Sequence, residues 1–538
     1  MKRYIAFAII LSICTVLNVF LIEKTDFFNI NETTSLEVSF SEESGHITAQ
    51  WDKLPYPCIY KVETFSKTTG RVDGEPTYHK FLEEYTSSSE YALPSSAIPM
   101  YYQVTAYGIF GKLASPFDVI PNPNYTNPPA PVTIVHYTAE NPASVKPYLV
   151  WHSVPRAVIY EVEILSAPPE KEGGVELSEK NHLFSTRRVY TNGYQADLSE
   201  YASRGTLYYR VRALDLDRKP IGVFSRSEAI TIDKSLTPPD YPLINTFDKM
   251  PGTETPLYPV YQWIPMHDER LYEVELMIEP PSDVSATEPS KNREWYHTAD
   301  DSFSCYDEYP RPYAGTYYWR VRAIDKSGKT IGRYSDIAVF TVPERKGGVF
   351  AAAFGDSITH GGGALSYSPF NAEYSYTTYL DFPALNLGMS GDTAHTTAMR
   401  FEDDVLPFHP RNLIIMTGSN DLRSYLTADD IIKDITTIRE KCLANDIRPI
   451  FLTLMPINPA NIEKAFHTPS DPDWMTKMKK INAFIREQEY YIDLEPYFYN
   501  KSHTLLNDDL SIDGLHPDIV GKMLMAEIIN MNKDKFRK

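Results

Sequence analysis

The sequence predicts a multidomain protein in which three all-β domains of about 100 residues precede one α/β domain. A pattern of aromatic residues recurs three times between residues 36 and 344, and apolar runs alternate with amphipathic stretches from residue 346 onward. At 538 residues the chain is too long for one hydrophobic core. The expected segments are a leader at 1–24, β domains at 36–121, 130–234 and 242–344, and an α/β domain at 346–538.

The first 24 residues have the pattern of an export signal. Two basic residues precede Tyr4–Ile22, nineteen residues without a charge, which as a helix would be about 28 Å long and would match a bilayer's hydrocarbon core. No A-x-A pattern follows, so we expect a retained membrane anchor, with a cleaved signal peptide and secretion as the alternative. The stretch LSIC at Cys14 is similar to a lipoprotein box, but Ile13 stands where a small residue is needed. Both outcomes predict an extracytoplasmic protein, and the anchor makes the membrane a partner.

Each β segment contains, in its first quarter, a tryptophan that is followed nine residues later by a tyrosine. The pairs are Trp51 with Tyr60, Trp151 with Tyr160, and Trp263 with Tyr272. A second matching stretch follows each pair and reads YYQVTAYG, YYRVRALD or YWRVRAID. The alternation of side chains in these stretches is typical of a half-buried antiparallel strand, with one face in the core and the other in water.

Units of this length, with a strand about every ten residues, predict β-sandwiches. They resemble fibronectin type III domains, in which an early-strand tryptophan packs on a later-strand tyrosine across the two sheets. Proline-rich runs at 122–132 and 235–242 mark the boundaries, because such runs form stiff, extended linkers. We expect the sandwiches to act as spacers, with carbohydrate binding through exposed tyrosines as the alternative.

From residue 346 the pattern becomes that of a parallel sheet covered by helices. The apolar runs read GVFAAAFG, FPALNLG, NLIIMTG, RPIFLTLMP and YYIDLEP. Helical stretches such as 429–445 and 474–488 separate them, which predicts strands buried on both faces. Five parallel strands in a region of this length suit a flavodoxin-like sheet, in which functional residues gather at the carboxyl ends of the strands.

Polar clusters follow these runs, as expected of a site at the strand ends. Ser357 lies in GDS, Gly391 in GMSGDT and Asn420 in GSND, while Asp513 and His516 lie in DGLHP before the final helix. Acyl transfer from an ester needs a nucleophile, a base, a group that orients the base, and donors for the oxyanion. Ser357, His516 and Asp513 could fill the first three roles. The N–H groups of Ser357 and Gly391 and the amide of Asn420 could form the oxyanion hole.

Each cluster alone also has a structural explanation, because short polar residues and glycine are typical of turns and helix starts. Their joint occurrence, in this order, resembles the SGNH hydrolases, the GDSL esterase and lipase family, over residues 346–538. The resemblance implies a serine esterase with a Ser-His-Asp triad and an acyl-enzyme. It implies Ser357, Asp513 and His516 as the catalytic residues, and Ser357, Gly391 and Asn420 as the oxyanion donors.

The sequence argues against several other chemistries. HGGG at 360–363 is similar to the oxyanion loop of α/β-hydrolases, but that loop precedes a G-x-S-x-G elbow, which the chain lacks. There is no metal-ligand motif, so we expect neither a metal nor another cofactor. The formal net charge of −19 disfavours nucleic acid as a partner.

Two stretches that flank the predicted site, 364–379 and 457–474, combine aromatic residues with Ser, Asn and Thr. The aromatic residues singled out are Tyr367, Phe370, Tyr374, Phe466 and Trp474. Such a surface suits a sugar ring better than a long acyl chain, and burial in the core is the alternative. We therefore expect an esterase that removes small acyl groups, most simply acetyl, from a carbohydrate. The alternative functions are a lysophospholipase or thioesterase and a non-catalytic surface adhesin.

Overall fold

The computed structural model describes residues 36–538, except for 44–45, 56, 94–99, 109–110, 117, 121–127, 249–253, 284–285, 301 and 363–370. The predicted leader at 1–24 therefore lies outside the described residues. Within the part that is described, no helix is both long and apolar enough to cross a bilayer. Two compact units are present, one formed by most of residues 36–120 and the other by residues 68–77 and 128–538.

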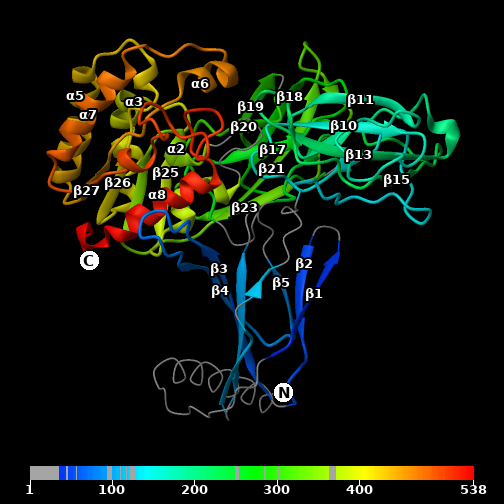
Figure 1. Ribbon diagram of the computed structural model, residues 1–538, viewed down its shortest axis with the longest axis horizontal. Coiled ribbons are helices and arrows are strands. Elements are labelled where there is room, and N and C mark those ends of the chain that lie inside the picture. Colours follow the sequence, from blue (N-terminus) through cyan, green and yellow to red (C-terminus); the bar gives the residue numbers. More distant parts are fainter. Residues whose placement is uncertain are drawn as a thin grey trace. The chain divides into compact units, whose positions relative to one another are not determined.

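The first β region, residues 36–120, contains two antiparallel sheets (Figure 1). The smaller has the order β1-β2-β5, with β1 at Val38–Glu43, β2 at His46–Trp51 and β5 at Glu90–Leu93. The larger has the order β4-β3-β6-β7, and β8 also pairs with β6. Its strands are β3 (Ile59–Lys67), β4 (Tyr78–Thr86), β6 (Tyr101–Gly108), β7 (Gly111–Ala114) and β8 (Asp118–Val119).

The second β region, residues 128–234, repeats this arrangement. Strands β9 (Tyr148–Val150) and β12 (Gly193–Gln195) pair with each other. The larger sheet has the order β11-β10-β13-β14, and β15 also pairs with β13. Its strands are β10 (Ile159–Leu165), β11 (His182–Val189), β13 (Thr206–Leu214), β14 (Pro220–Ile221) and β15 (Glu228–Thr231).

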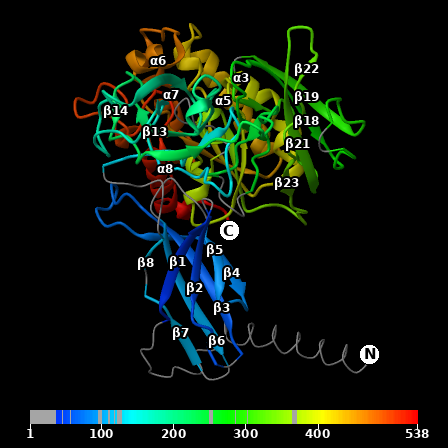
Figure 2. The same ribbon diagram turned by 90° about the vertical axis from the view of Figure 1, so that its right-hand side faces the viewer.

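The third β region, residues 242–344, has the same two-sheet pattern. Its smaller sheet has the order β16-β17-β20, with strands at Leu243–Ile244, Val260–Ile264 and Ser304–Tyr306. The larger sheet has the order β19-β18-β21-β22, and β23 also pairs with β21; Figure 2 shows β18, β19 and β21 side by side. Its strands are β18 (Leu271–Met277), β19 (Arg293–Asp300), β21 (Gly315–Ile324), β22 (Thr330–Ile331) and β23 (Ala338–Val342).

The repeated tryptophan and tyrosine make the same contact in all three regions. Their ring centroids are 5.1 Å apart in the first region and 5.4 Å apart in the second and third. Each tyrosine hydroxyl also accepts a hydrogen bond from the backbone N–H three residues after the tryptophan, at 3.1, 2.9 and 2.9 Å. Each tyrosine belongs to the larger sheet of its region. Each tryptophan lies in the smaller sheet or directly after one of its strands. The contact between the two rings therefore joins the two sheets.

The predicted half-buried strands are in fact buried on both faces in the second and third regions. Arg210 in β13 is 1% exposed, and Arg320, at the matching place in β21, is also 1% exposed. The guanidinium of Arg320 lies 2.7 Å from the Glu275 carboxylate and packs over the ring of Tyr334.

Loops cover this second face and complete its polar contacts. Backbone carbonyls of Glu176 and Asp283 accept hydrogen bonds from Arg210 and Arg320 respectively. Alternation in a sequence shows which side chains share a face, but it does not show whether a loop covers that face. The charged face was therefore wrongly expected to be in water.

We expect Glu275→Ala to lower the free energy of unfolding of the third β region by about 3–5 kcal/mol, because it leaves Arg320 buried without its carboxylate partner. Urea denaturation of the full chain, followed by tryptophan fluorescence, measures this change. Glu254→Ala is the control, since this carboxylate is 58% exposed where it pairs with Arg345, and its loss should cost at most about 1 kcal/mol. Equal effects of the two substitutions would contradict the prediction.

The α/β region, residues 346–538, contains the predicted five-stranded parallel sheet. Its strands are β24 (Ala351–Gly355), β25 (Ala384–Gly388), β26 (Asn412–Met416), β27 (Arg448–Leu452) and β28 (Tyr491–Ile492). All pairs are parallel, and the order is β25-β24-β26-β27-β28. Numbered from the first strand, this is the order 2-1-3-4-5 of a flavodoxin-like sheet. Each strand lies within one of the apolar runs, as predicted.

Helices connect and cover these strands (Figure 1). The α-helices are α2 (Ser357–His360), α3 (Ala394–Met399), α4 (Phe401–Asp404), α5 (Ala428–Ala444), α6 (Pro459–Phe466), α7 (Trp474–Arg486) and α8 (Ile519–Met531). The short 3-10 helices of this region are η2 (Ala372–Tyr374), η3 (Tyr376–Tyr379), η4 (Leu406–Phe408), η5 (Asp421–Arg423), η6 (Glu495–Tyr497) and η7 (Lys533–Lys535), while η1 (Ala202–Arg204) belongs to the second β region. The two helices predicted at 429–445 and 474–488 correspond to α5 and α7. Helix α5 begins with a Thr427–Asp430 capping box and buries Ile431, Ile435, Ile438 and Cys442 along one face.

Candidate active site

Three of the five predicted site residues follow strand ends that lie side by side. In the sheet register, Gly355 of β24 faces both Gly388 of β25 and Met416 of β26. Ser357, Gly391 and Asn420 stand two, three and four residues beyond these positions. Because parallel strands end at the same edge of a sheet, the three segments leave it together, as the sequence predicted.

Ser357 is the first residue of α2, so the chain turns directly from strand to helix at this point. The turn is held by Asp356, whose Oδ1 accepts a hydrogen bond of 2.9 Å from the N–H of Ile358. Ser357 retains an exposed fraction of 8%. Its hydroxyl is thus placed at the sheet edge by a capped helix start rather than by a flexible loop.

Ser357, His516 and Asp513 form a continuous hydrogen-bonded chain. Ser357 Oγ lies 2.7 Å from His516 Nε2, and His516 Nδ1 lies 2.8 Å from Asp513 Oδ2. A carboxylate can only accept, so Nδ1 carries the imidazole proton and Nε2 is left to accept from the serine hydroxyl. In this tautomer the imidazole can take up the hydroxyl proton.

The DGLHP segment folds around the carboxylate of Asp513. Its Oδ1 accepts hydrogen bonds of 2.8 Å from the backbone N–H groups of both Leu515 and His516. These bonds leave Oδ2 to hold the imidazole, and Asp513 itself is 2% exposed. The orientation of His516 is therefore set by the local fold of this segment.

The two other predicted donors differ in how they are held. Gly391 is exposed, has φ +91° and has open space where a side chain would be. Asn420 donates one amide hydrogen to the Asp392 carbonyl at 2.8 Å, which leaves its second hydrogen for another acceptor. Among the described residues, neither the N–H of Ser357 nor that of Gly391 has a hydrogen-bond acceptor. These groups are available to a ligand oxygen.

Two buried titratable groups adjoin α2: Asp356, which caps its start, and Lys522, which was not singled out from the sequence. Lys522 of α8 is fully buried, and its Nζ donates to the carbonyl of Ile358. Burial lowers the pKa of Lys522 to about 7 and raises the pKa of Asp356 to about 6, and each charge partly offsets the effect on the other. No local sequence signal marks Lys522, because its burial depends on α8 packing under α2.

The flanking aromatic residues have different roles from those expected. Tyr374 and Trp474 are buried in the core, so the alternative interpretation is the correct one for them. Tyr367 and Phe370 lie outside the described residues. Of the three aromatic residues that the structure describes, Phe466 is the one that contacts a predicted site residue, with its ring edge-to-face against His516 at 5.9 Å between centroids. Arg423, also not singled out from the sequence, lies over the Phe466 ring, with its guanidinium carbon 5.4 Å from the ring centroid.

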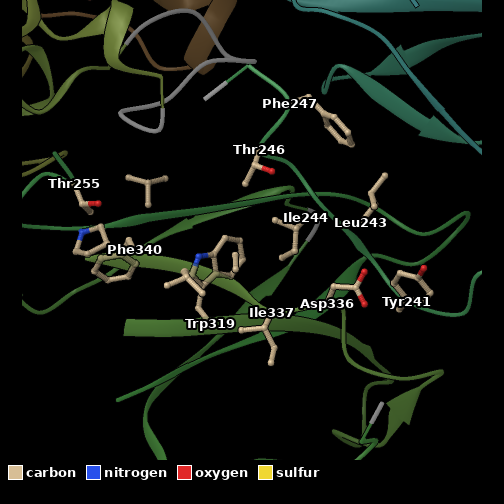
Figure 3. Close-up of a pocket in the computed structure, with 14 residues that line it drawn as sticks. Tyr241, Leu243, Ile244, Thr246, Phe247, Thr255, Trp319, Asp336, Ile337 and Phe340 are labelled. Atoms are coloured by element: carbon tan, nitrogen blue, oxygen red, sulfur yellow. The ribbon is translucent and has the colours of Figure 1, made fainter. Parts of the chain in front are cut away.

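Figure 3 shows a cavity of about 560 Å³ elsewhere in the chain, in the third β region. Tyr241, Phe247, Trp319 and Phe340 are among the residues that line it. None of its lining residues belongs to the α/β region, so this cavity is not the site formed around Ser357.

Gly362 lies so close to His516 and Ser357 that only a residue without a side chain fits there. A Cβ at this position would lie 2.9 Å from Cδ2 and 3.2 Å from Nε2 of His516, and 3.1 Å from the carbonyl oxygen of Ser357. A side chain would therefore push against the ring that contacts Ser357. This contact explains why one position of the HGGG stretch is a glycine.

Comparison with known proteins identifies the class of this domain. Residues 353–522, which include all five predicted site residues, match the GDSL-like lipase/acylhydrolase family. The matched residues thus form a GDSL-like lipase/acylhydrolase domain, the catalytic unit of a carboxylic ester hydrolase. Residues 346–538 are called the hydrolase domain below.

Individual relatives match shorter parts of the chain. The uncharacterized lipoprotein YqeF of Bacillus subtilis is 28% identical over 130 residues, which are 22% of this chain and 53% of that protein, so the chain spans about half of this relative. Among solved structures, the lipase/acylhydrolase of Enterococcus faecalis is 21% identical over 35% of this chain and 96% of its own, with a TM-score of 0.29. An acetylxylan esterase of Geobacillus stearothermophilus is 20% identical over 36% of this chain and 100% of its own, with a TM-score of 0.27.

We expect Gly362→Ala to lower kcat for a small soluble ester by about tenfold or more, because the added methyl displaces the imidazole from Ser357. Steady-state kinetics measure the loss, and circular dichroism checks the fold. Gly174→Ala is the matched control, since the nearest atom to its Cβ would be 3.8 Å away. The prediction fails if the two variants keep the same kcat.

Proposed function

We propose that the protein is a serine esterase in which Ser357, His516 and Asp513 form the catalytic triad. The observation that carries this proposal is the hydrogen-bonded chain from Ser357 Oγ through His516 to the Asp513 carboxylate, with distances of 2.7 and 2.8 Å. The N–H groups of Ser357 and Gly391 and the amide of Asn420 act as the oxyanion donors in this proposal.

The chemistry follows from this arrangement. His516 Nε2 takes the proton of Ser357 as Oγ attacks the ester carbonyl, and the donors stabilise the negative oxygen that forms. The tetrahedral intermediate then expels the alcohol, which receives the proton from His516, and an acyl-Ser357 ester remains. Water attacks this ester with His516 again as the base, which releases the acid and restores the serine.

The proposed substrate is a carbohydrate that carries small acyl groups, most simply acetyl. Tyr425 supports this proposal, because it lies five residues after Asn420 and its side chain is 89% exposed, so its ring is free to stack on a sugar. Phe466 beside His516 adds an apolar wall that would contact a short acyl chain. A lysophospholipid or an acyl thioester is the alternative substrate of the same chemistry.

We expect Ser357→Ala to reduce esterase turnover to near background, since the group that forms the acyl-enzyme is lost. His516→Ala should have nearly the same effect because the serine loses its base. Asn420→Ala should lower kcat by about 10²–10³-fold, or roughly 3–4 kcal/mol, with KM little changed, because one oxyanion donor is removed. Hydrolysis of nitrophenyl acetate measures all three, with circular dichroism as the check on folding.

The same assay separates the proposed substrate from its alternatives. A series of nitrophenyl esters should be cleaved fastest at acetyl, and acetylated polysaccharide should release acetate. A preference for long acyl chains would favour the lysophospholipase. If folded Ser357→Ala kept more than a few per cent of wild-type activity, the triad assignment would be wrong and the adhesin would become the better explanation.

We also propose that the three β regions are fibronectin type III-like sandwiches with the boundaries 36–121, 130–234 and 242–344. Their support is the Trp–Tyr contact between the two sheets, which recurs in each region with the same backbone hydrogen bond. As spacers they would hold the hydrolase domain away from a membrane surface. Limited proteolysis should cut first in the proline-rich runs at 122–132 and 235–242, and early cuts within the sandwiches would count against these boundaries.

The proposed location is outside the cytoplasm, with residues 1–24 retained as a membrane anchor. The uncharged stretch Tyr4–Ile22 supports this location, and the naming of the Bacillus subtilis relative as a lipoprotein agrees with it. The full-length protein should fractionate with membranes and keep its first residues. N-terminal sequencing that began near Lys24 or later would show instead that the segment is cleaved.

A further inference from the structure

A short segment of the third β region is built into the hydrolase domain. Leu257 and Tyr258 pack in the hydrophobic core that surrounds the parallel sheet, not in the core of their own region. The N–H of Leu257 donates a 3.0 Å hydrogen bond to the carbonyl of Asn386 in β25, which is the edge strand. This segment therefore covers an edge that would otherwise expose unpaired backbone groups.

A first chain of hydrogen bonds connects the backbone of Tyr258 to the segment Ser390–Gly391–Asp392, which is called the Gly391 loop below. Nε2 of His360, the last residue of α2, lies 2.8 Å from the Tyr258 carbonyl oxygen. His360 Nδ1 lies 2.9 Å from Ser390 Oγ and accepts a 3.2 Å hydrogen bond from the Ser390 N–H. Because a carbonyl can only accept, the imidazole proton must be on Nε2, and Nδ1 is free to accept from Ser390. Burial lowers the pKa of His360 to about 3, so this neutral tautomer persists at ordinary pH.

A second route starts from the hydroxyl of Tyr258. This hydroxyl donates a 2.6 Å hydrogen bond to Asp404 Oδ2, which also accepts a 2.7 Å bond from Arg400. The Nε of Arg400 donates a 2.5 Å bond to Asp392 Oδ2. Arg400 further donates to the backbone carbonyl of Gly355 at the end of β24, which ties this route to the strand that leads to Ser357.

The two routes end on the two neighbours of Gly391. We infer that Tyr258 is a positioning residue of the oxyanion hole: from the third β region it holds Ser390 through His360 and Asp392 through Asp404 and Arg400, and so aligns the N–H of Gly391. This inference rests on the proposed function, in which Gly391 is an oxyanion donor.

Gly391 needs such support, since it is exposed, has no side chain and has φ +91°. An oxyanion donor contributes only when its N–H is already aimed at the developing charge, and small displacements of such groups are costly. The third β region is thus more than a spacer, because it supplies part of the framework of the site.

The inference is tested in the full chain with Tyr258→Phe, which deletes the hydroxyl route while keeping the size of the side chain. Ser390→Ala removes the serine hydroxyl from the His360 route, and it serves as a second variant that does not disturb the core. Tyr261→Phe is the matched control, because its hydroxyl donates a 2.9 Å bond to buried Asp307 within the third β region and belongs to neither of the two routes to Gly391.

Two measurements are made on each variant. Amide hydrogen exchange, followed by mass spectrometry, should become faster for the peptide that contains Ser390 and Asp392 in Tyr258→Phe and Ser390→Ala, but not in Tyr261→Phe. For nitrophenyl acetate, Tyr258→Phe should lower kcat by about tenfold with KM within about twofold, while Tyr261→Phe leaves both unchanged. A purely structural role of Tyr258 would not produce this split between kcat and KM.

Exchange rates equal to those of Tyr261→Phe would overturn the inference, whatever the activity. Faster exchange with wild-type kcat would also overturn it, because the loop would then move without consequence for catalysis. Failure of the proposed function is a separate result: Ser357→Ala would be as active as wild type. In that case the exchange comparison still decides whether Tyr258 holds the Gly391 loop.

Discussion

The close contact among the ends of β24, β25 and β26 is the constraint on which the rest of the site depends. A Cβ on Gly355 would lie 1.9 Å from the carbonyl oxygen of Met416, and one on Gly388 would lie 2.3 Å from the backbone nitrogen of His360. Both distances are too short for any side chain. Glycine at these positions lets α2 start directly against its neighbours, so Ser357 leaves the sheet beside the loops that carry Gly391 and Asn420.

Buried carboxylates hold neighbouring side chains in one orientation when all of their own oxygens accept hydrogen bonds. Asp513 accepts two backbone N–H groups and the imidazole, which fixes the ring of His516. In the third β region, Glu275 bonds both Arg320 and Arg293, and these contacts bury a face that would otherwise need apolar residues. A buried charge is costly without partners, so each of these arrangements favours one geometry over others.

Residues outside the range that matches the family also contribute to the surroundings of the site. Residues 353–522 include the Ser357–His516–Asp513 chain, but Tyr258 lies about a hundred residues before this range. Leu257 and Tyr258 join the core of the hydrolase domain and cover its edge strand, while Tyr258 also contacts His360 and Asp404. The hydrolase domain of this chain therefore uses residues from a neighbouring region both for its core and around its site.

By itself, the sequence determined the order of the strands, the parallel sheet and the five candidate site residues, because these depend on local patterns. Apolar runs mark buried strands, and Ser357, Gly391, Asn420, Asp513 and His516 follow from short motifs at the ends of runs or before a helix.

Only the tertiary structure decided that Arg210 and Arg320 are buried, that Trp474 packs in the core while Phe466 meets His516, and that Lys522 lies beneath α2. The same holds for the link from Tyr258 through His360 to Ser390. In each case the contact joins residues far apart in the chain, and no local pattern records which loop or helix will cover a given side chain.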